Sequence, residues 1–142
     1  VAGWPAYYQE PLFYEIWINA DTLPKRNAFS DAMVTSSGYT RYSTRLAVDV
    51  IAYAKRFPSP SDPTALVNDI VRHLYAIPIS DTLKASLKSS SLLSGQSSDH
   101  YWTDAWNLHI ANPTDIAAKN AVITRLQSLL KALMNAAEYQ LA

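Results

Sequence analysis

The sequence predicts an all-α protein: a single-domain bundle of about six helices behind an irregular, aromatic-rich N-terminal segment. Apolar residues recur at helical spacing from Thr22 onward. Only 3 of the 142 residues are glycine, which is few for the many tight turns of an all-β architecture. A chain of this length normally forms one domain. We therefore expect one domain over residues 1–142, irregular in residues 1–21 and helical in residues 22–142.

The stretch from Asp115 to Leu141 predicts a long C-terminal helix. Its apolar residues fall on one wide face, at steps of three and four: Val122, Ile123, Leu126, Leu129, Leu130, Leu133, Met134, Ala137 and Leu141. At ~1.5 Å per residue, the helix would run roughly 40 Å. Its apolar face is too broad for a strict coiled-coil seam, so we expect this helix to pack against several others.

Residues 22–57 predict two further helices. Thr22 precedes Leu23-Pro24 and is typical of a helix start, so the first helix is expected over residues 22–34. Ser43 or Thr44 can cap the second helix. That helix would turn six apolar side chains inward: Leu46, Ala47, Val50, Ile51, Ala54 and Phe57.

The proline-serine run from Pro58 to Pro63 resembles a linker, but we interpret it as a stiff loop inside one domain. Each side of it has only about half the residues of a typical domain. Asp62 is then expected to cap a helix with Pro63 at its first position. Its buried face would hold five residues: Leu66, Val67, Ile70, Val71 and Leu74.

Two more helices are expected before the long C-terminal one. Ser80 can cap a short helix. A polar loop over residues 89–98 follows, and the Leu92-Leu93 pair would anchor it to the core. The next helix would start near Ser98 or Asp99 and run to Asn112, with core tryptophans at positions 102 and 106.

The composition excludes several classes of partner. The 12 basic residues balance the 12 acidic ones and the pI is near 7.0, so no global field favours nucleic acid or an anionic membrane. No apolar run approaches the ~20 residues of a membrane span. We therefore expect no nucleic-acid partner and no membrane insertion. The absence of cysteine excludes disulfides and thiolate sites.

No strong catalytic or metal-binding motif occurs. The hydrolase elbow, phosphate-binding loop, dinucleotide fingerprint and His-Glu-x-x-His patterns are all missing. The histidines are at positions 73, 100 and 109. The last two are half a turn out of phase on one helix, so they cannot ligate the same ion. The serine-rich loop beside Asp99 and His100 holds all triad residue types, but adjacency in sequence is not triad geometry. We assign no catalytic residue, metal ligand or cofactor.

Aromatic residues are the one excess that suggests binding. The candidates lie near the N-terminus, beside Pro5 and Pro11, where residues 13–18 could form a short strand or an extended segment. Exposed rings in a groove can stack on sugars or on a peptide. The candidate binding residues are Trp4, Tyr7, Tyr8, Tyr14 and Trp17. A core role is the alternative for all of them, as it is for Trp102 and Trp106.

Three groups of residues form a familiar pattern: Gly3-Trp4-Pro5 with Trp17-Ile18-Asn19, Thr22-Leu23 and Arg26-Asn27; Leu66 to Ile70 with Pro78-Ile79-Ser80; and Arg125-Leu126 with Glu138 to Leu141. Together they resemble the bacterial domain-of-unknown-function 1800 family. Residues 6–15 depart from the family pattern as a longer aromatic insert. The family's block adds Asn19 to the candidate residues, in either a structural or a functional role.

The resemblance implies that the chain is the C-terminal part of a longer, exported bacterial protein, periplasmic or at the cell surface. It also implies an upstream region and perhaps a second exported protein as partners. We expect a non-catalytic structural or protein-interaction module, with an exposed apolar patch and a tendency to form a homo-oligomer. A glycan-binding surface built on the N-terminal aromatics is the first alternative. A fragment of a hydrolase with its catalytic residues upstream is the second.

Overall fold

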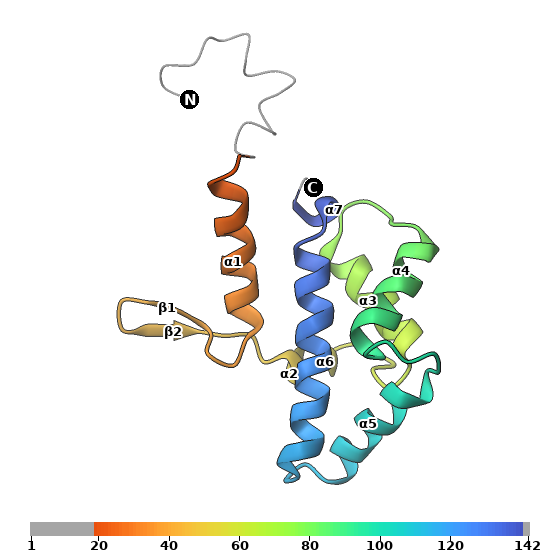
Figure 1. Ribbon diagram of the computed structural model, residues 1–142. Coiled ribbons are helices and arrows are strands. Elements are labelled where there is room, and N and C mark those ends of the chain that lie inside the picture. Colours follow the sequence, from red (N-terminus) through yellow and green to blue (C-terminus); the bar gives the residue numbers. More distant parts are fainter. Residues whose placement is uncertain (1–18, 141–142) are drawn as a thin grey trace, which may run out of the picture.

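A computed structural model describes residues 19–140 (Figure 1). The mainly helical prediction is confirmed. The elements of the described residues are α1 (Thr22–Val34), β1 (Tyr39–Arg41), β2 (Thr44–Leu46), α2 (Val50–Ala54), α3 (Pro63–Leu74), α4 (Asp81–Leu87), the π-helical turn η3 (Lys88–Leu92), α5 (His100–Ala111), α6 (Ile116–Met134) and α7 (Ala137–Gln140).

Helix α6 is the central element of the fold. It contacts α1 and α2, as well as α4, η3, α5 and α7. In Figure 1, α1 and the hairpin of β1 and β2 lie on one side of α6, and α3, α4 and α5 lie on the other. The apolar stripe predicted from the sequence is the face that makes these contacts, since six α6 residues are buried: Ala118, Val122, Leu126, Leu129, Leu130 and Leu133.

The hydrophobic core lies between α6 and the elements on the α3–α5 side. Leu66 and Ile70 of α3, Leu92 of η3 and Trp102 of α5 are completely buried. The prediction that Leu92 and Leu93 anchor the serine-rich loop is confirmed, because both are almost fully buried. Trp102 and Trp106 also belong to the core, with ring centroids 5.6 Å apart.

A β-hairpin replaces the expected start of the second helix, so that prediction was wrong. Strands β1 and β2 pair antiparallel, with Arg41 opposite Thr44 across a two-residue turn. Tyr42 in this turn has φ 55°, and Gly38 before the hairpin has φ 68°, values that a helix does not contain. Helix α2 begins only at Val50, where the Asp49 side chain accepts hydrogen bonds from two backbone N–H groups.

The long C-terminal helix is shorter than the sequence predicts. Helix α6 ends at Met134 after 19 residues, which corresponds to roughly 28 Å rather than roughly 40 Å. Asn135 forms its C-cap, and the Gln140 side-chain amide donates a 2.6 Å hydrogen bond to the Met134 carbonyl. This side-chain bond satisfies a helix-end carbonyl and folds α7 back against α6.

The expected loop at Pro58–Pro63 connects parts of the same core. The indole Nε1 of Trp102 donates a 2.9 Å hydrogen bond to the Pro60 carbonyl, and the Thr103 hydroxyl donates to the Ser61 carbonyl at 2.9 Å. Asp62 caps α3 and Pro63 begins it, as predicted. No helix in residues 19–140 is both long enough and apolar enough to cross a membrane.

Candidate functional site

Most of the candidate residues from the sequence lie outside the described residues: Trp4, Tyr7, Tyr8, Tyr14 and Trp17. The exception is Asn19. Its Oδ1 accepts hydrogen bonds from the backbone N–H groups of Asp21 and Thr22, each 2.9 Å long. Because these N–H groups belong to the N-cap and the first residue of α1, Asn19 stabilises the start of this helix. Its described role is therefore structural.

A groove between α3 and α4 is one concave feature of the described residues. Tyr75 to Ser80 connect the two helices, and the Ser80 hydroxyl caps α4 by accepting from Leu83 N–H at 3.2 Å. Two neighbouring pockets of about 490 and about 310 Å³ share Asn68. They also share two residues of α4, Asp81 and Lys84. Together they form one continuous groove.

Polar side chains line both walls of this groove above an apolar floor. On α3, Thr64, Asn68 and Arg72 follow one another at intervals of four residues, so they form a single stripe. Asp81, Lys84 and Lys88 form the facing stripe. The apolar lining consists of Val67, Val71, Tyr75, Ala76, Ile77, Pro78, Ile79 and Ala85.

The three cations of the groove differ in their partners. Lys84 Nζ lies 3.0 Å from the Asp81 carboxylate. Lys88 Nζ contacts both oxygens of the Asp99 carboxylate, at 2.9 and 3.1 Å, and the Thr64 hydroxyl at 3.0 Å. Arg72 makes no hydrogen bond or ion pair with any described residue. Its guanidinium is therefore available to a ligand.

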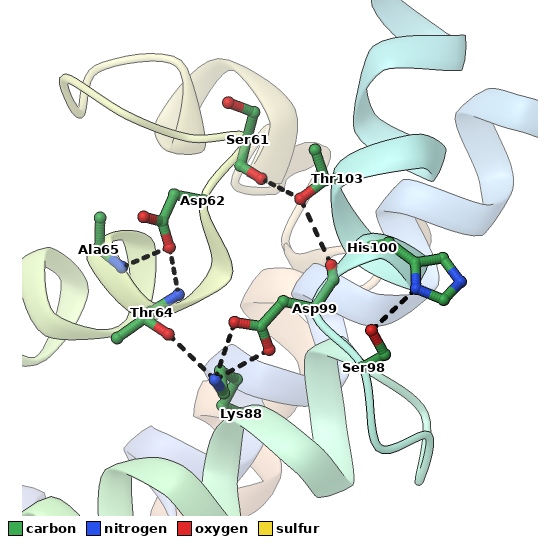
Figure 2. Close-up of polar contacts among 9 residues, drawn as sticks. All are labelled: Ser61, Asp62, Thr64, Ala65, Lys88, Ser98, Asp99, His100 and Thr103. Carbon is green, nitrogen blue, oxygen red and sulfur yellow. Dashed lines mark hydrogen bonds and ion pairs between the residues drawn. The ribbon is translucent and has the colours of Figure 1, made fainter.

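Lys88 links α3 to the start of α5 beside the groove (Figure 2). Its ammonium joins the first turn of α3, through Thr64, to Asp99 at the start of α5. Asp62 accepts from Thr64 N–H at 2.8 Å, so the same turn of α3 is capped on its other side. The three donors of the Lys88 ammonium are used within the protein, which makes its role mainly structural.

The π-helical turn η3 places Lys88 at this junction. Leu93 N–H donates to the Lys88 carbonyl at 3.0 Å, five residues back along the chain. Such turns insert a residue into a helix and are frequent at functional sites. Here the turn also buries Ser91, Leu92 and Leu93 against the core. The exposed end of η3 therefore carries Lys88 while its other face supports the core.

A second candidate surface is formed by residues 19–49, which we call the arm. The arm comprises α1 and the β-hairpin, and in Figure 1 the hairpin projects from the end of α1 away from the other helices. Only Val34 of α1 is buried. Four large apolar side chains of the arm are exposed to solvent: Phe29, Tyr42, Leu46 and Val48.

Polar contacts attach the arm to the end of α6 and to α7. The buried Gln140 side chain accepts from Arg26 Nε at 2.9 Å and donates to Asn27 Oδ1 at 3.2 Å. Asn135 Nδ2 donates to Asp31 Oδ1 at 3.1 Å. Few apolar contacts support these bonds, so the arm is less firmly packed than the rest of the described chain.

The histidines do not form a common site. His109 is buried on α5, and its Nδ1 has no hydrogen-bond partner. His73 packs against Tyr53 and Phe57, and His100 Nδ1 lies 2.8 Å from the Ser98 hydroxyl. Within residues 19–140, no group of three or more His, Cys, Asp or Glu side chains could hold a metal ion.

Sequence reasoning missed the groove. The signal was present, because Thr64, Asn68 and Arg72 repeat at steps of four. The predicted apolar face of the same segment is confirmed for Leu66, Val67, Ile70 and Val71, whereas Leu74 is only partly buried. That the stripe on α4 and η3 faces the stripe on α3 becomes evident only from the structure, in which α3 and α4 lie side by side.

No family model, curated protein or solved structure matches this chain. The resemblance to the domain-of-unknown-function 1800 family therefore stays a prediction.

Proposed function

We propose that this protein is a protein-interaction module that docks onto its partner through the arm. One observation carries the proposal. The arm exposes Phe29, Leu46 and Val48 by 48%, 49% and 38%, and Tyr42 at the hairpin tip by 90%. Large apolar side chains that gather on the surface of a soluble protein mark interaction sites when they form a patch.

The hairpin itself supports this proposal. An isolated two-stranded hairpin is at best marginally stable in water. All residues from Thr40 to Asp49 are exposed, so no sheet or helix covers either face of β2. Phe29 and Tyr39 make an edge-to-face contact with ring centroids 4.8 Å apart, which orients the hairpin relative to α1. A partner that covered this surface would supply the missing packing.

The charge of the hairpin favours an acidic partner surface. Arg41 and Arg45 lie in the hairpin, and no carboxylate residue occurs between Asp31 and Asp49. Arg45 donates to the Ser36 carbonyl, whereas Arg41 lies 5.6 Å from the centre of the Tyr42 ring. The partner is therefore a protein with an apolar strip bordered by Asp or Glu. The family resemblance suggests an upstream region of the parent protein or a second exported bacterial protein.

Photocrosslinking at the hairpin tip tests this proposal. Benzoylphenylalanine replaces Tyr42 in the 142-residue chain, and the same substitution at the exposed Tyr101 of α5 is the matched control. We expect a specific crosslink from position 42, mapped by mass spectrometry to an acidic, apolar surface. The added substitution Arg41→Glu should abolish it, and Arg56→Glu outside the arm should not.

Other outcomes would contradict the proposal. Equal crosslinking from positions 42 and 101 would show no preference for the arm. A crosslink only to a second copy of the chain would indicate self-association in place of an acidic partner. The glycan-binding alternative rests on residues that lie outside residues 19–140, apart from Asn19, whose side chain accepts hydrogen bonds from the backbone just before and at the start of α1. No described residue favours that alternative or the hydrolase fragment.

A further inference from the structure

We propose that the groove between α3 and α4 binds a short, extended, acidic peptide segment of a partner protein. This site is separate from the arm and goes beyond the proposed function. It combines an unpaired guanidinium at one end, an unpaired amide at its middle and an apolar floor. Each of these features corresponds to a different part of the peptide.

The dimensions of the groove fit about four peptide residues. Thr64 and Arg72 mark the two ends of the α3 wall. They are eight positions apart on the helix, which corresponds to ~12 Å along the axis. An extended peptide rises ~3.3 Å per residue, so four residues cover the same length. The two pockets, about 490 and about 310 Å³, lie along this line.

The charge of the groove selects an acidic ligand. Three cations and one carboxylate line it, and the Asp99 carboxylate beside Lys88 brings the local net charge to +1, on a protein whose formal net charge is 0. Lys88 is held by Thr64 and Asp99, and Lys84 is shared with Asp81. The excess positive charge is therefore concentrated at Arg72. A guanidinium can accept a carboxylate through two parallel hydrogen bonds.

Asn68 favours a peptide over a simple anion as the ligand, because its side-chain amide can bind a peptide backbone. It lines both pockets and lies between Thr64 and Arg72 on α3. Its side-chain amide has no hydrogen-bond partner among the described residues. An amide can donate to one peptide carbonyl and accept from one peptide N–H. The peptide backbone would thus bind Asn68 at the point where its chain crosses α3.

Apolar residues of the ligand have a place beside the acidic one. Ile77 is 50% exposed at the Arg72 end of the groove, next to Pro78 and Ile79. A residue adjacent to the peptide carboxylate can cover this apolar wall. The ligand pattern is therefore Asp or Glu followed or preceded by an aliphatic residue.

Fluorescence anisotropy with a defined probe tests the proposal. The probe is a fluorescein-labelled Ala-Glu-Ile-Glu-Leu-Ala peptide with blocked ends, and the matched control carries Gln in place of Glu. We expect saturable binding of the acidic peptide to the 142-residue chain and none of the neutral one. Affinity should fall as the salt concentration rises, because salt screens exposed charges.

Two substitutions with opposite expected effects locate the binding. Arg72→Ala should weaken binding about 10- to 100-fold, since it removes a charge-assisted pair. Asp81→Asn should strengthen binding about 2- to 5-fold, because it removes a repulsive carboxylate and frees Lys84. Arg56→Ala, at an exposed arginine outside the groove, should leave the affinity unchanged. Thermal unfolding of each variant confirms that it is folded.

Several results would overturn the proposal. One is equal binding of the neutral peptide, and another is unchanged affinity in Arg72→Ala. If N-acetylglutamate amide bound as tightly as the peptide, the groove would be a small-molecule site instead. Arg41→Glu in the arm should not alter peptide binding, so failure of the groove and failure of the arm can be distinguished.

Discussion

The arm and the remainder of the described chain, residues 50–140, which we call the body, are held together by different interactions. In the body, Leu66, Ile70, Trp102 and Leu129 are completely buried. In the arm, Val34 is the single buried apolar residue. Polar contacts through Gln140 and Asn135 supply much of the arm's attachment.

This difference predicts two levels of stability in one molecule. Burial of a large apolar side chain contributes roughly 1.5–3 kcal/mol, whereas a typical hydrogen bond contributes about 0.5–1.5 kcal/mol. The body should therefore unfold cooperatively, and the arm should open locally at lower free energy. Surfaces that bind partners are often drawn from such less stable regions.

Removing a core aromatic from the body should have the largest effect. Trp102→Ala leaves a cavity and removes the hydrogen bond to the Pro60 carbonyl. The unfolding free energy should fall by about 3–5 kcal/mol, measured by denaturant titration. Leu108→Ala, at a half-exposed leucine of the same helix, should change it by less than about 0.5 kcal/mol. Similar losses in both variants would contradict our assignment of the core.

The second-largest effect should be a fall in the unfolding free energy of the body at alkaline pH. Burial raises the pKa of Tyr75 to about 12 from 10.0, and Glu138 adds to the shift. The folded state therefore binds the phenolic proton more tightly than the unfolded state. Its stabilisation is complete below pH 10 and is lost as the pH rises towards 12, by on the order of 2 kcal/mol.

Unfolding titrations between pH 9 and pH 12 measure this loss. Tyr75→Phe removes the ionisable group and should flatten the pH profile, although it also loses the 2.7 Å hydrogen bond to the Leu133 carbonyl. Some slope should remain, since burial also raises the pKa of Tyr53. An unchanged profile in Tyr75→Phe would show that this phenol is not the group responsible.

Loss of Gln140 should affect the arm more than the body. Gln140→Ala removes the side-chain contacts to Arg26, Asn27 and the Met134 carbonyl. We expect hydrogen exchange of α1 to accelerate by about 5- to 10-fold, corresponding to roughly 1 kcal/mol. The amides in the middle of α6 should keep their protection. Equal acceleration in both helices would mean that the arm and the body unfold together.

The smallest expected difference between the arm and the body is at their two glycines with positive φ, Gly38 and Gly95. A Cβ at Gly38 in the arm would lie 2.5 Å from the Leu46 carbonyl oxygen, whereas a Cβ at Gly95 in the body would meet nothing within 4 Å. Both Ala variants carry the backbone cost of about 1 kcal/mol. Gly38→Ala should in addition shift the backbone resonances of the hairpin. Hairpin shifts of the same size in Gly95→Ala would contradict this steric explanation.

Local sequence rules predicted much of the body. Asp62 with Pro63, and Ser80, are strong start signals, and each begins a helix as expected. The stripe on α6 is a repeat of large apolar residues over five turns, which tertiary contacts did not override. The groove was not predicted, because the sequence of α3 does not indicate that α4 packs beside it, and the sequence of α4 does not indicate α3.

The arm shows where local rules fail. Thr44 is both an acceptable helix cap and a good strand residue, so the segment after Gly38 admitted a helix or a hairpin. The hydrogen bond from Val48 N–H to the Met33 carbonyl, 2.8 Å long, returns the chain to α1 and leaves too little chain for an early helix start. The side chain of Gln140 ended the long helix at Met134 in the same way, through a contact between distant elements.

The sequence by itself therefore determined the helical class, most helix starts and the apolar face of α6. These features depend on residues within one or two turns of each other. Only the tertiary structure showed that residues 39–46 form a hairpin and that α6 ends at Met134. It alone also showed that Arg72 and Asn68 face α4 across the groove. The physical reason is that each of these depends on contacts with residues outside the helix concerned, whose energies are comparable to the small local preferences that they override.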